Sequence, residues 1–212
     1  MTADLRAGFA RVEITPAVGD PQWTSTIETI VDPVFVRVLC LEQAGGESFI
    51  LAMADHGGFD RVADRRMRAA ISRATGVPAS HVRINGSHNH TCPEASWAVT
   101  ETLAGIGQPH VSLEWLARCE DLAAGAAAAA KRQAVPVQVC AGSTDICDVA
   151  ANRAFDAPDG KRVIRLGSSA TPAAQETMFG GPAGLIDPVA GVLALRDQAG
   201  TTVAILLNYS CH

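Results

Sequence analysis

A pair of histidines separated by one residue is the clearest chemical signal in this sequence. His88 and His90 belong to the segment Val82–Pro93, whose first residues alternate between apolar and polar side chains as in a β-strand. In an extended backbone, residues i and i+2 point to the same face, about 6.5–7 Å apart along the strand. The two imidazoles are therefore expected to face one point, while Asn89 faces away. Such rings can share a metal ion, or one can bind the metal while the other transfers a proton. Taken alone, the pattern also describes two half-exposed loop histidines.

A further histidine follows a second strand at the far end of the sequence. The continuous apolar run Val203–Leu207 is typical of a buried strand, and it leads through Asn208–Cys211 to His212. Two strands that lie far apart in the chain thus each end near a histidine. We expect them to bring the imidazoles of His88 and His212 to a common point.

These two segments resemble the neutral/alkaline (non-lysosomal) ceramidase family. Ser87–Pro93 reads Ser-His-Asn-His-Thr-Cys-Pro and is similar to that family's Thr-His-Thr-His-Ser-Gly-Pro segment. Leu207–His212 is similar to its Asn-Phe-Ala-Val-His-Pro segment. Shorter pieces agree in the same order, namely Val12–Pro16, Asp32-Pro33 and Asn152-Arg153. The sequence departs from the family at Asn89, at Cys92, and at Ala154-Phe155, where the family has Ser-Pro.

The resemblance implies a zinc-dependent hydrolase that cleaves the N-acyl amide bond of ceramide or a related N-acyl lipid by a metal-activated water. His88 and His212 would be the zinc ligands. His90 would be the catalytic residue, hydrogen-bonded to the attacking water, the oxyanion or the leaving amine. Arg153 and Asn152 would bind polar atoms of the substrate, although a surface salt bridge is the alternative for a lone arginine. Zn²⁺ suits imidazole ligands, and a hydrolytic site keeps one position for a water that ionises near neutral pH.

The resemblance spans all 212 residues but only the N-terminal part of the family's catalytic domain. A catalytic zinc normally has three protein ligands, and the family's remaining ligands, a glutamate and a tyrosine, belong to later sequence. We therefore expect residues 1–212 to form a single domain that is the N-terminal portion of a longer ceramidase-like catalytic domain. The isolated chain is expected to bind zinc weakly and to turn over nothing.

Other functions remain open at this point. The same site also suits a metal-dependent amidase acting on a non-sphingolipid N-acyl substrate. A second alternative is a non-catalytic ceramidase-like module in which the site is vestigial. A thiol mechanism through Cys92 is a further alternative, with histidines nearby but no clear orienting acid.

The composition excludes several other classes of protein. Apolar residues make up 48% of the chain, which is enough for a substantial core and excludes a disordered protein. The net charge of −5 gives no electrostatic footprint for nucleic acid, and no apolar run is long enough for a transmembrane helix. The resemblance implies a small-molecule or lipid substrate as the partner, while the oligomeric state is not indicated. The sequence shows no signal peptide, which predicts a cytoplasmic protein, although members of the family resembled can be secreted.

The elements that position the histidines are typical of an α/β (mixed α+β) fold with layered mixed sheets, hairpins and flanking helices. A helix is expected from Asp60 to about Thr75, ended by Gly76, and a second helix from Ser112. The first helix connects two strands, which favours a mixed sheet with that helix packed on it. Its expected apolar face consists of Ala63, Met67, Ala70, Ile71 and Ala74. Strands are expected at 8–14, 34–41, 48–54, 82–85, 137–141, 189–195 and 203–207.

The expected loops carry the remaining hypotheses. Asp55–Gly58 follows a strand and is interpreted either as part of the site or as the cap of the next helix. Residues 94–111 are expected to be irregular, and the thirty or so residues of 155–186 to form a lid or binding loop. Cys40 and Cys140 lie in apolar segments and are expected to be small buried hydrophobes.

Overall fold

The structure is a computed structural model that describes most of the chain as two compact units. The first unit comprises Met1–Gln138 with Leu195–Ala204, and the second comprises Val139–Ala194 with Ile205–His212. The described residues are 5–22, 25–104, 110–150, 152, 154–156, 160, 162–164 and 185–211. The expectation of a single domain stays a prediction, and each unit is described by itself below.

The expected mixed α+β architecture is confirmed. Among the described residues, seven strands hydrogen-bond in the order β11 (Thr202–Asn208), β10 (Val189–Asp197), β7 (Val135–Asp145), β1, β4, β5 and β6, the last four of which have the bounds given next. In the first unit, β1 (Leu5–Glu13) pairs antiparallel with β4 (Phe35–Gln43), and β4 pairs antiparallel with β5 (Ser48–Ala54). The strand β6 (Val82–Gly86) then joins β5 in parallel. This parallel pair brings the carboxyl ends of β5 and β6 to the same edge of the sheet.

The helix α1 (Arg61–Thr75) connects β5 to β6 and begins and ends where the sequence predicts. Its N-cap Asp60 accepts the N–H of Ala63 at 2.7 Å, and its C-cap Gly76 has the left-handed φ of 71° that favours glycine. The predicted apolar face is buried except at Ala74, which is exposed. The helix ends one residue after Ala74, so Ala74 lies at the end of the helix, past its buried residues.

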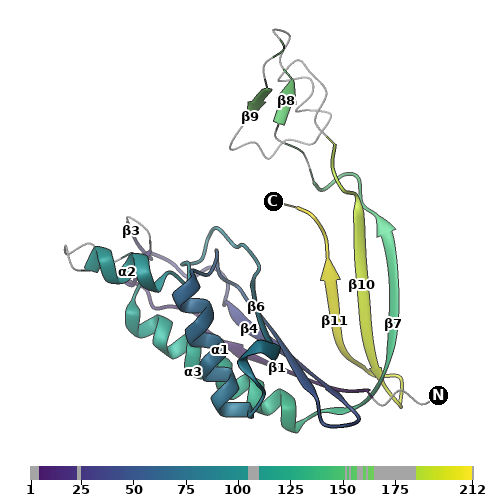
Figure 1. Cartoon of the computed structure of the whole chain (residues 1–212). Coiled ribbons are helices and arrows are strands. Elements are labelled where there is room, and N and C mark those ends of the chain that lie inside the picture. The colour runs from purple at the N-terminus through teal and green to yellow at the C-terminus, as the bar shows by residue number, and fades with distance from the viewer. Residues whose placement is uncertain are drawn as a thin grey trace. The chain divides into compact units, whose positions relative to one another are not determined.

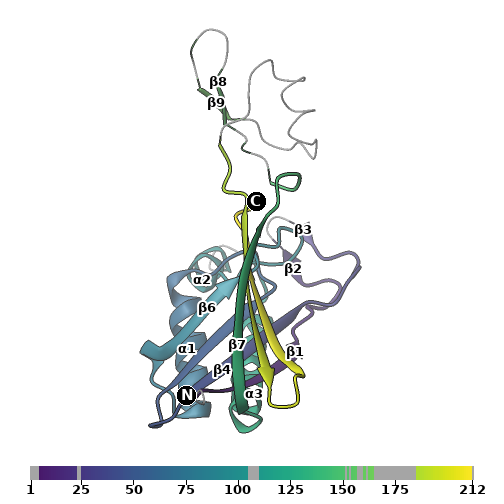
Figure 2. The ribbon, with the colours of Figure 1, turned by 90° about the vertical axis from the view of Figure 1, so that its right-hand side faces the viewer.

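The helix α3 (Leu113–Arg132) packs on α1 and on the strands β1 and β4. Figures 1 and 2 show both helices on one face of these strands. Ser112 caps α3 as predicted by accepting the N–H of Trp115 at 3.1 Å. The strand and helix are very close at Gly8, where a Cβ would lie 1.9 Å from the carbonyl oxygen of Ala130. Only glycine fits at this contact.

The expectation that residues 94–111 are irregular was wrong. Trp97–Ala104 form the helix α2, and residues 105–109 lie outside the described part of the chain. The N–H of Ala98, in the first turn of α2, donates to the second carboxylate oxygen of Asp60 at 2.8 Å. One aspartate therefore caps two helices. The indole of Trp97 is buried under the guanidinium of Arg66, which lies 3.8 Å from the ring centroid.

Short elements complete the two units. The strands β10 (Val189–Asp197) and β11 (Thr202–Asn208) are adjacent, and the turn between them is fixed by the side chain of Asp197, as the predicted hairpin requires. The strand β7 (Val135–Asp145) is longer than expected. The remaining described elements are β2 (Pro21–Gln22), β3 (Ser25–Thr26), the 3₁₀ turn η1 (Ala79–His81), β8 (Ala154–Asp156) and β9 (Arg162–Ile164).

The long loop expected at 155–186 falls mostly outside the described residues. Within it, β8 and β9 pair antiparallel, so a short hairpin replaces part of the expected irregular chain. Cys40 is buried as predicted, whereas Cys140 is exposed on β7, whose side chains are mostly exposed, so the prediction for Cys140 was wrong. Among the described helices, none is long and apolar enough to cross a membrane.

Candidate active site

The two histidines of the His-X-His pair lie close together, but in a tight turn. The strand β6 ends at Gly86, and His88 has a φ of 59°, the only positive φ among the described residues other than glycine. The Nε2 atoms of His88 and His90 are 3.1 Å apart, and the two rings meet edge to face with centroids 4.5 Å apart. The expected extended backbone was therefore wrong. A left-handed residue, and not strand alternation, turns the two imidazoles toward each other.

A backbone carbonyl fixes the tautomer of His88. Its Nδ1 lies 2.6 Å from the carbonyl oxygen of Gly57. Because a carbonyl oxygen only accepts, Nδ1 carries the proton, and Nε2 is the basic nitrogen of the neutral ring. In the neutral pair, His90 then donates its Nε2–H to Nε2 of His88. A carbonyl behind the imidazole is the arrangement that orients histidine ligands of metal ions.

The segment Asp55–Gly58 supports this loop from the end of β5. The Asp55 carboxylate accepts the N–H of Phe35 at 3.0 Å and binds Nη1 of Arg37 at 2.8 Å, so it holds the sheet and does not cap α1. The ring of His56 is fully buried, and burial lowers its pKa to about 4. Of the two interpretations of this segment, the structure thus favours the one that makes it part of the site.

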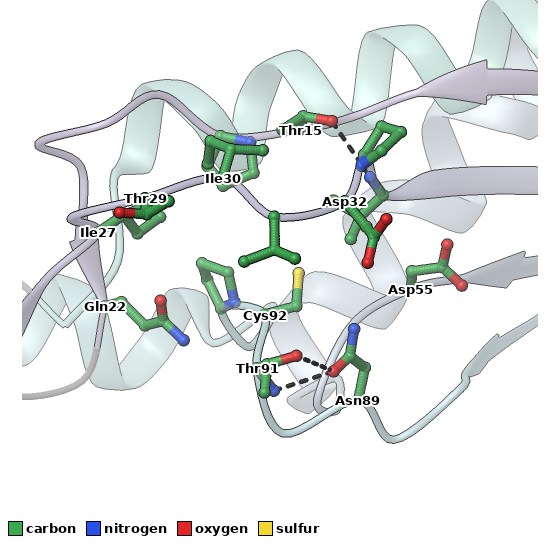
Figure 3. Close-up of a pocket in the computed structure, with 15 residues that line it drawn as sticks. Thr15, Gln22, Ile27, Thr29, Ile30, Asp32, Asp55, Asn89, Thr91 and Cys92 are labelled. Atoms are coloured by element: carbon green, nitrogen blue, oxygen red, sulfur yellow. Dashed lines mark hydrogen bonds between the residues drawn. The ribbon is translucent and has the colours of Figure 1, made fainter.

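A pocket of about 580 Å³ lies in the first unit beside the histidine loop. Its walls combine apolar side chains with polar ones from the loop and from Asp55, as Figure 3 shows. Thr91 donates both its backbone N–H and its hydroxyl to the Asn89 side-chain oxygen, at 2.9 and 2.7 Å. The Asn89 side chain therefore holds the loop and lines the pocket. The lining residues that Figure 3 labels are Thr15, Gln22, Ile27, Thr29, Ile30, Asp32, Asp55, Asn89, Thr91 and Cys92.

The Cys92 thiol is poorly suited to act as a nucleophile. Its side chain is buried, and burial, with the nearby charge of Asp55 as a second cause, raises its pKa to about 12. The thiolate is the reactive form of cysteine. A thiol mechanism is therefore disfavoured at neutral pH.

The other predicted site residues are only partly described. Asn152 donates its side-chain N–H to the carbonyl of Leu185 at 2.9 Å and accepts the N–H of Ala154 at 2.9 Å. Both ends of its amide thus hold the local chain, and substrate binding by Asn152 stays a prediction. Arg153 and His212 lie outside the described residues, so the meeting of His88 and His212 stays a prediction too.

The donor chemistry of this loop fits zinc, and the described residues do not complete a site. His88 presents a basic Nε2 held by a carbonyl bond on Nδ1, as a zinc-binding imidazole requires. Within the described ranges, no group of three or more His, Cys, Asp or Glu side chains is placed to hold a metal ion. Any zinc bound here would need ligands from outside these ranges.

Sequence reasoning indicated the segment Asp55–Gly58 but not the two groups in it that support the histidine loop. The carbonyl of Gly57 and the buried ring of His56 both contact it. The signal for them was the Asp-His-Gly-Gly sequence directly after a strand, since the strand that follows α1 ends at the same edge of the sheet.

The described residues form a mixed sheet covered by helices, with a histidine loop at the end of a parallel pair of strands. Two solved structures share this fold. Neutral ceramidase from Pseudomonas aeruginosa matches with a TM-score of 0.70 and 17% sequence identity, over 99% of this chain and 32% of that one. A structure described as ceramidase complexed with C2 matches with a TM-score of 0.73 and 17% identity, over 99% of this chain and 31% of that one.

At this identity the likeness establishes a shared fold. The chain spans about a third of the length of these two structures, with 32% and 31% covered. No protein-family model and no curated protein matches the sequence.

Proposed function

We propose that this chain carries part of the active site of a zinc-dependent hydrolase that cleaves the N-acyl amide bond of ceramide or a related N-acyl lipid. The observation that carries the proposal is the pair of facing imidazoles, with 3.1 Å between Nε2 of His88 and Nε2 of His90. The shared fold with two ceramidase structures and the resemblance of the histidine segments support the substrate class.

His88 is the metal ligand in this proposal, and His212 is the second ligand. The Gly57 carbonyl holds the proton of His88 on Nδ1, so that Nε2 offers its lone pair without a prior loss of a proton. Bound zinc would supply a water that ionises near neutral pH.

His90 is the proposed proton carrier. Its Nε2 lies 3.1 Å from Nε2 of His88, the nitrogen that would bind the metal, so His90 borders the place where a metal-bound water would react. With Nε2 of His88 bound to the metal, the bond from His90 to that nitrogen would be lost. In the tautomer that carries its proton on Nδ1, His90 would then accept the proton of the attacking water at Nε2 and return it to the leaving amine. Arg153 and Asn152 would bind polar atoms of the substrate.

The pocket beside the loop suits part of an amphipathic substrate. Its volume of about 580 Å³ lies within the usual range for ligand sites. Apolar walls from Ile27 and Ile30 face polar groups of Asn89 and Thr91 across it. An N-acyl lipid presents the same combination of an apolar chain and a polar amide.

Residues 1–212 are proposed to be the N-terminal portion of a longer catalytic domain. The support is that nearly all of this chain, 99%, matches only 32% and 31% of the two ceramidase structures. The isolated 212 residues are then expected to bind zinc weakly and to hydrolyse nothing. Comparison with the chain extended through its downstream reading frame, by zinc titration and by the hydrolysis assay below, tests this expectation.

The decisive experiment measures fatty-acid release by the extended chain from a short-chain fluorescent ceramide and from a panel of other N-acyl amides, together with its zinc content. Hydrolysis of ceramide that a chelator abolishes and zinc restores is the expected result. His90→Gln should retain zinc and lower kcat by about 100- to 10,000-fold.

The matched control is His81→Gln. The ring of His81 also contacts a backbone carbonyl, that of Ser48 at 3.3 Å, but on η1, before β6 begins. It should behave as the unchanged protein does. Hydrolysis confined to non-sphingolipid amides would favour an amidase of another specificity, and a protein without metal and without activity would refute the proposal in favour of a non-catalytic module.

A further inference from the structure

We propose that His56 is a positioning residue that holds the histidine loop in the conformation in which His88 and His90 face each other. This inference deepens the proposed function and rests on it. Nothing in the resemblance or in the fold assigns a role to this position. The evidence is a set of contacts between the end of β5 and the loop that follows β6.

His56 contacts both ends of the turn that follows His88. Its backbone carbonyl accepts the N–H of Asn89 at 3.2 Å, and its ring Nδ1 lies 3.2 Å from the carbonyl oxygen of Pro93. Its neighbour Gly57 accepts the Nδ1–H of His88 at 2.6 Å. The short segment at the end of β5 thus fixes the turn and the ring of its first histidine together.

The bond to Pro93 determines the tautomer of His56. A carbonyl oxygen only accepts, so Nδ1 of His56 carries the proton and Nε2 is left with a lone pair. The ring lies edge-on between Phe59 and Trp115, at centroid distances of 5.0 and 5.1 Å. Nε2 is buried there and has no hydrogen-bond partner among the described residues.

A histidine is an unfavourable choice for packing alone at this position. An unpartnered ring nitrogen in an apolar environment disfavours the folded state. A phenylalanine would fill the same space between Phe59 and Trp115 without that penalty. What only the histidine supplies is the donor to Pro93, and this bond goes to the loop that carries the two site histidines.

The contact between the segment and the loop is close at two glycines. A Cβ on Gly57 would lie 2.9 Å from Cγ of Glu94 and 3.3 Å from the carbonyl oxygen of Asn89. A Cβ on Gly86, where β6 ends, would lie 3.1 Å from the carbonyl oxygen of His56. The backbone at the end of β5 therefore packs closely against the end of β6 and the loop that follows it. The bond between the His56 ring and the Pro93 carbonyl adds a side-chain hydrogen bond to this contact.

Two substitutions separate positioning from packing. His56→Phe keeps the ring volume and removes the donor, whereas His56→Asn places an amide N–H near the former Nδ1 and restores a donor to Pro93. Small displacements of catalytic groups lower rates by about 100-fold. The expected result is that His56→Phe folds, keeps KM within about twofold and lowers kcat by about 10- to 100-fold, while His56→Asn recovers most of kcat.

A second readout does not need hydrolase activity. In nitrogen-15 NMR of the histidine rings, the unchanged protein should show His88 protonated on Nδ1, and His56→Phe should show a mixture of tautomers for that ring. Amide exchange of Asn89 should accelerate in His56→Phe and return toward its original rate in His56→Asn. His81→Gln is again the matched control and should alter neither readout.

The outcomes are separable from those of the proposed function. If the chain extended through its downstream reading frame hydrolyses no N-acyl amide, the proposed function fails, and the NMR and exchange data alone decide the role of His56. If His56→Phe leaves the tautomer of His88 and the exchange of Asn89 unchanged, His56 is a packing residue and the inference is overturned. If neither variant folds, the ring serves the core, and the inference is equally overturned.

Discussion

Replacing Asp60 by alanine is expected to destabilise two helices at once. One carboxylate oxygen of Asp60 accepts the N–H of Ala63 in α1 at 2.7 Å, and the other accepts the N–H of Ala98 in α2 at 2.8 Å. An N-cap side chain contributes about 1 kcal/mol, so losing both bonds should lower the free energy of unfolding by about 2 kcal/mol. In a chain of this size that corresponds to a fall in Tm of about 4–8 °C.

Thermal unfolding followed by far-UV circular dichroism measures this change. Asp64→Ala is the matched control, because Asp64 lies in the first turn of the same helix and forms only an i,i+4 pair with Arg68 at 3.4 Å. That pair is worth no more than about 0.5 kcal/mol. Asp60→Asn keeps one carbonyl oxygen and should lose about half as much stability as Asp60→Ala. The reasoning is refuted if Asp60→Ala melts no lower than Asp64→Ala, or if the asparagine variant is as unstable as the alanine variant.

Three further predictions follow from close packing and burial. Gly8→Ala should lower the free energy of unfolding by about 1–3 kcal/mol or more, because its methyl group would lie 1.9 Å from the carbonyl oxygen of Ala130. Denaturant unfolding measures this change, with Gly125→Ala as the control, since a Cβ at Gly125 has no atom within 4 Å. The lowered pKa of His56, about 4, means that the unfolded chain takes up this proton first as the pH falls. Stability should therefore decline between about pH 6.5 and 4, and less steeply in His56→Phe; equal slopes in urea titrations would contradict this. Cys92, with its pKa raised to about 12, should resist iodoacetamide at pH 8 until the chain unfolds, whereas the exposed Cys140 should react at once, as peptide mass mapping would show.

Local signals in the sequence were sufficient for the elements that local chemistry determines. The caps of α1 and α3 are short-range hydrogen bonds, Asp60 to Ala63 and Ser112 to Trp115, and both were predicted from residue type and spacing. The hairpin of β4 and β5 and a mixed sheet with α1 packed on it followed from the order of strands and helix, and the structure adds that β6 pairs with β5 in parallel.

The misses have a common cause in contacts between residues far apart in the sequence. The N–H of Ala98 in the first turn of α2 is bonded to Asp60, which lies 38 residues earlier. No local sequence pattern predicts a cap from so distant a residue. Cys140 lies on β7 in an apolar run, yet its side chain is exposed, because residue type alone does not show which strand face is covered. The sequence correctly predicted that His88 and His90 face each other, but the predicted extended backbone was wrong. The left-handed φ of His88 occurs together with a bond from its ring to Gly57, 31 residues earlier, which no local pattern indicates.

Because β5 and β6 pair in parallel, the candidate site residues lie at one edge of the sheet, apart from the helices that cover its face. Both strands end at one edge, so the two turns at 55–58 and 87–93 meet there, while α1, which connects them, packs on the face of the sheet. Exchanging the paired turns together, as a cassette, would change the reactive groups and leave the covered layers intact. Under the proposed function, laboratory evolution toward new amide substrates should therefore randomise these two turns jointly, because they contact each other closely at Gly57 and Gly86.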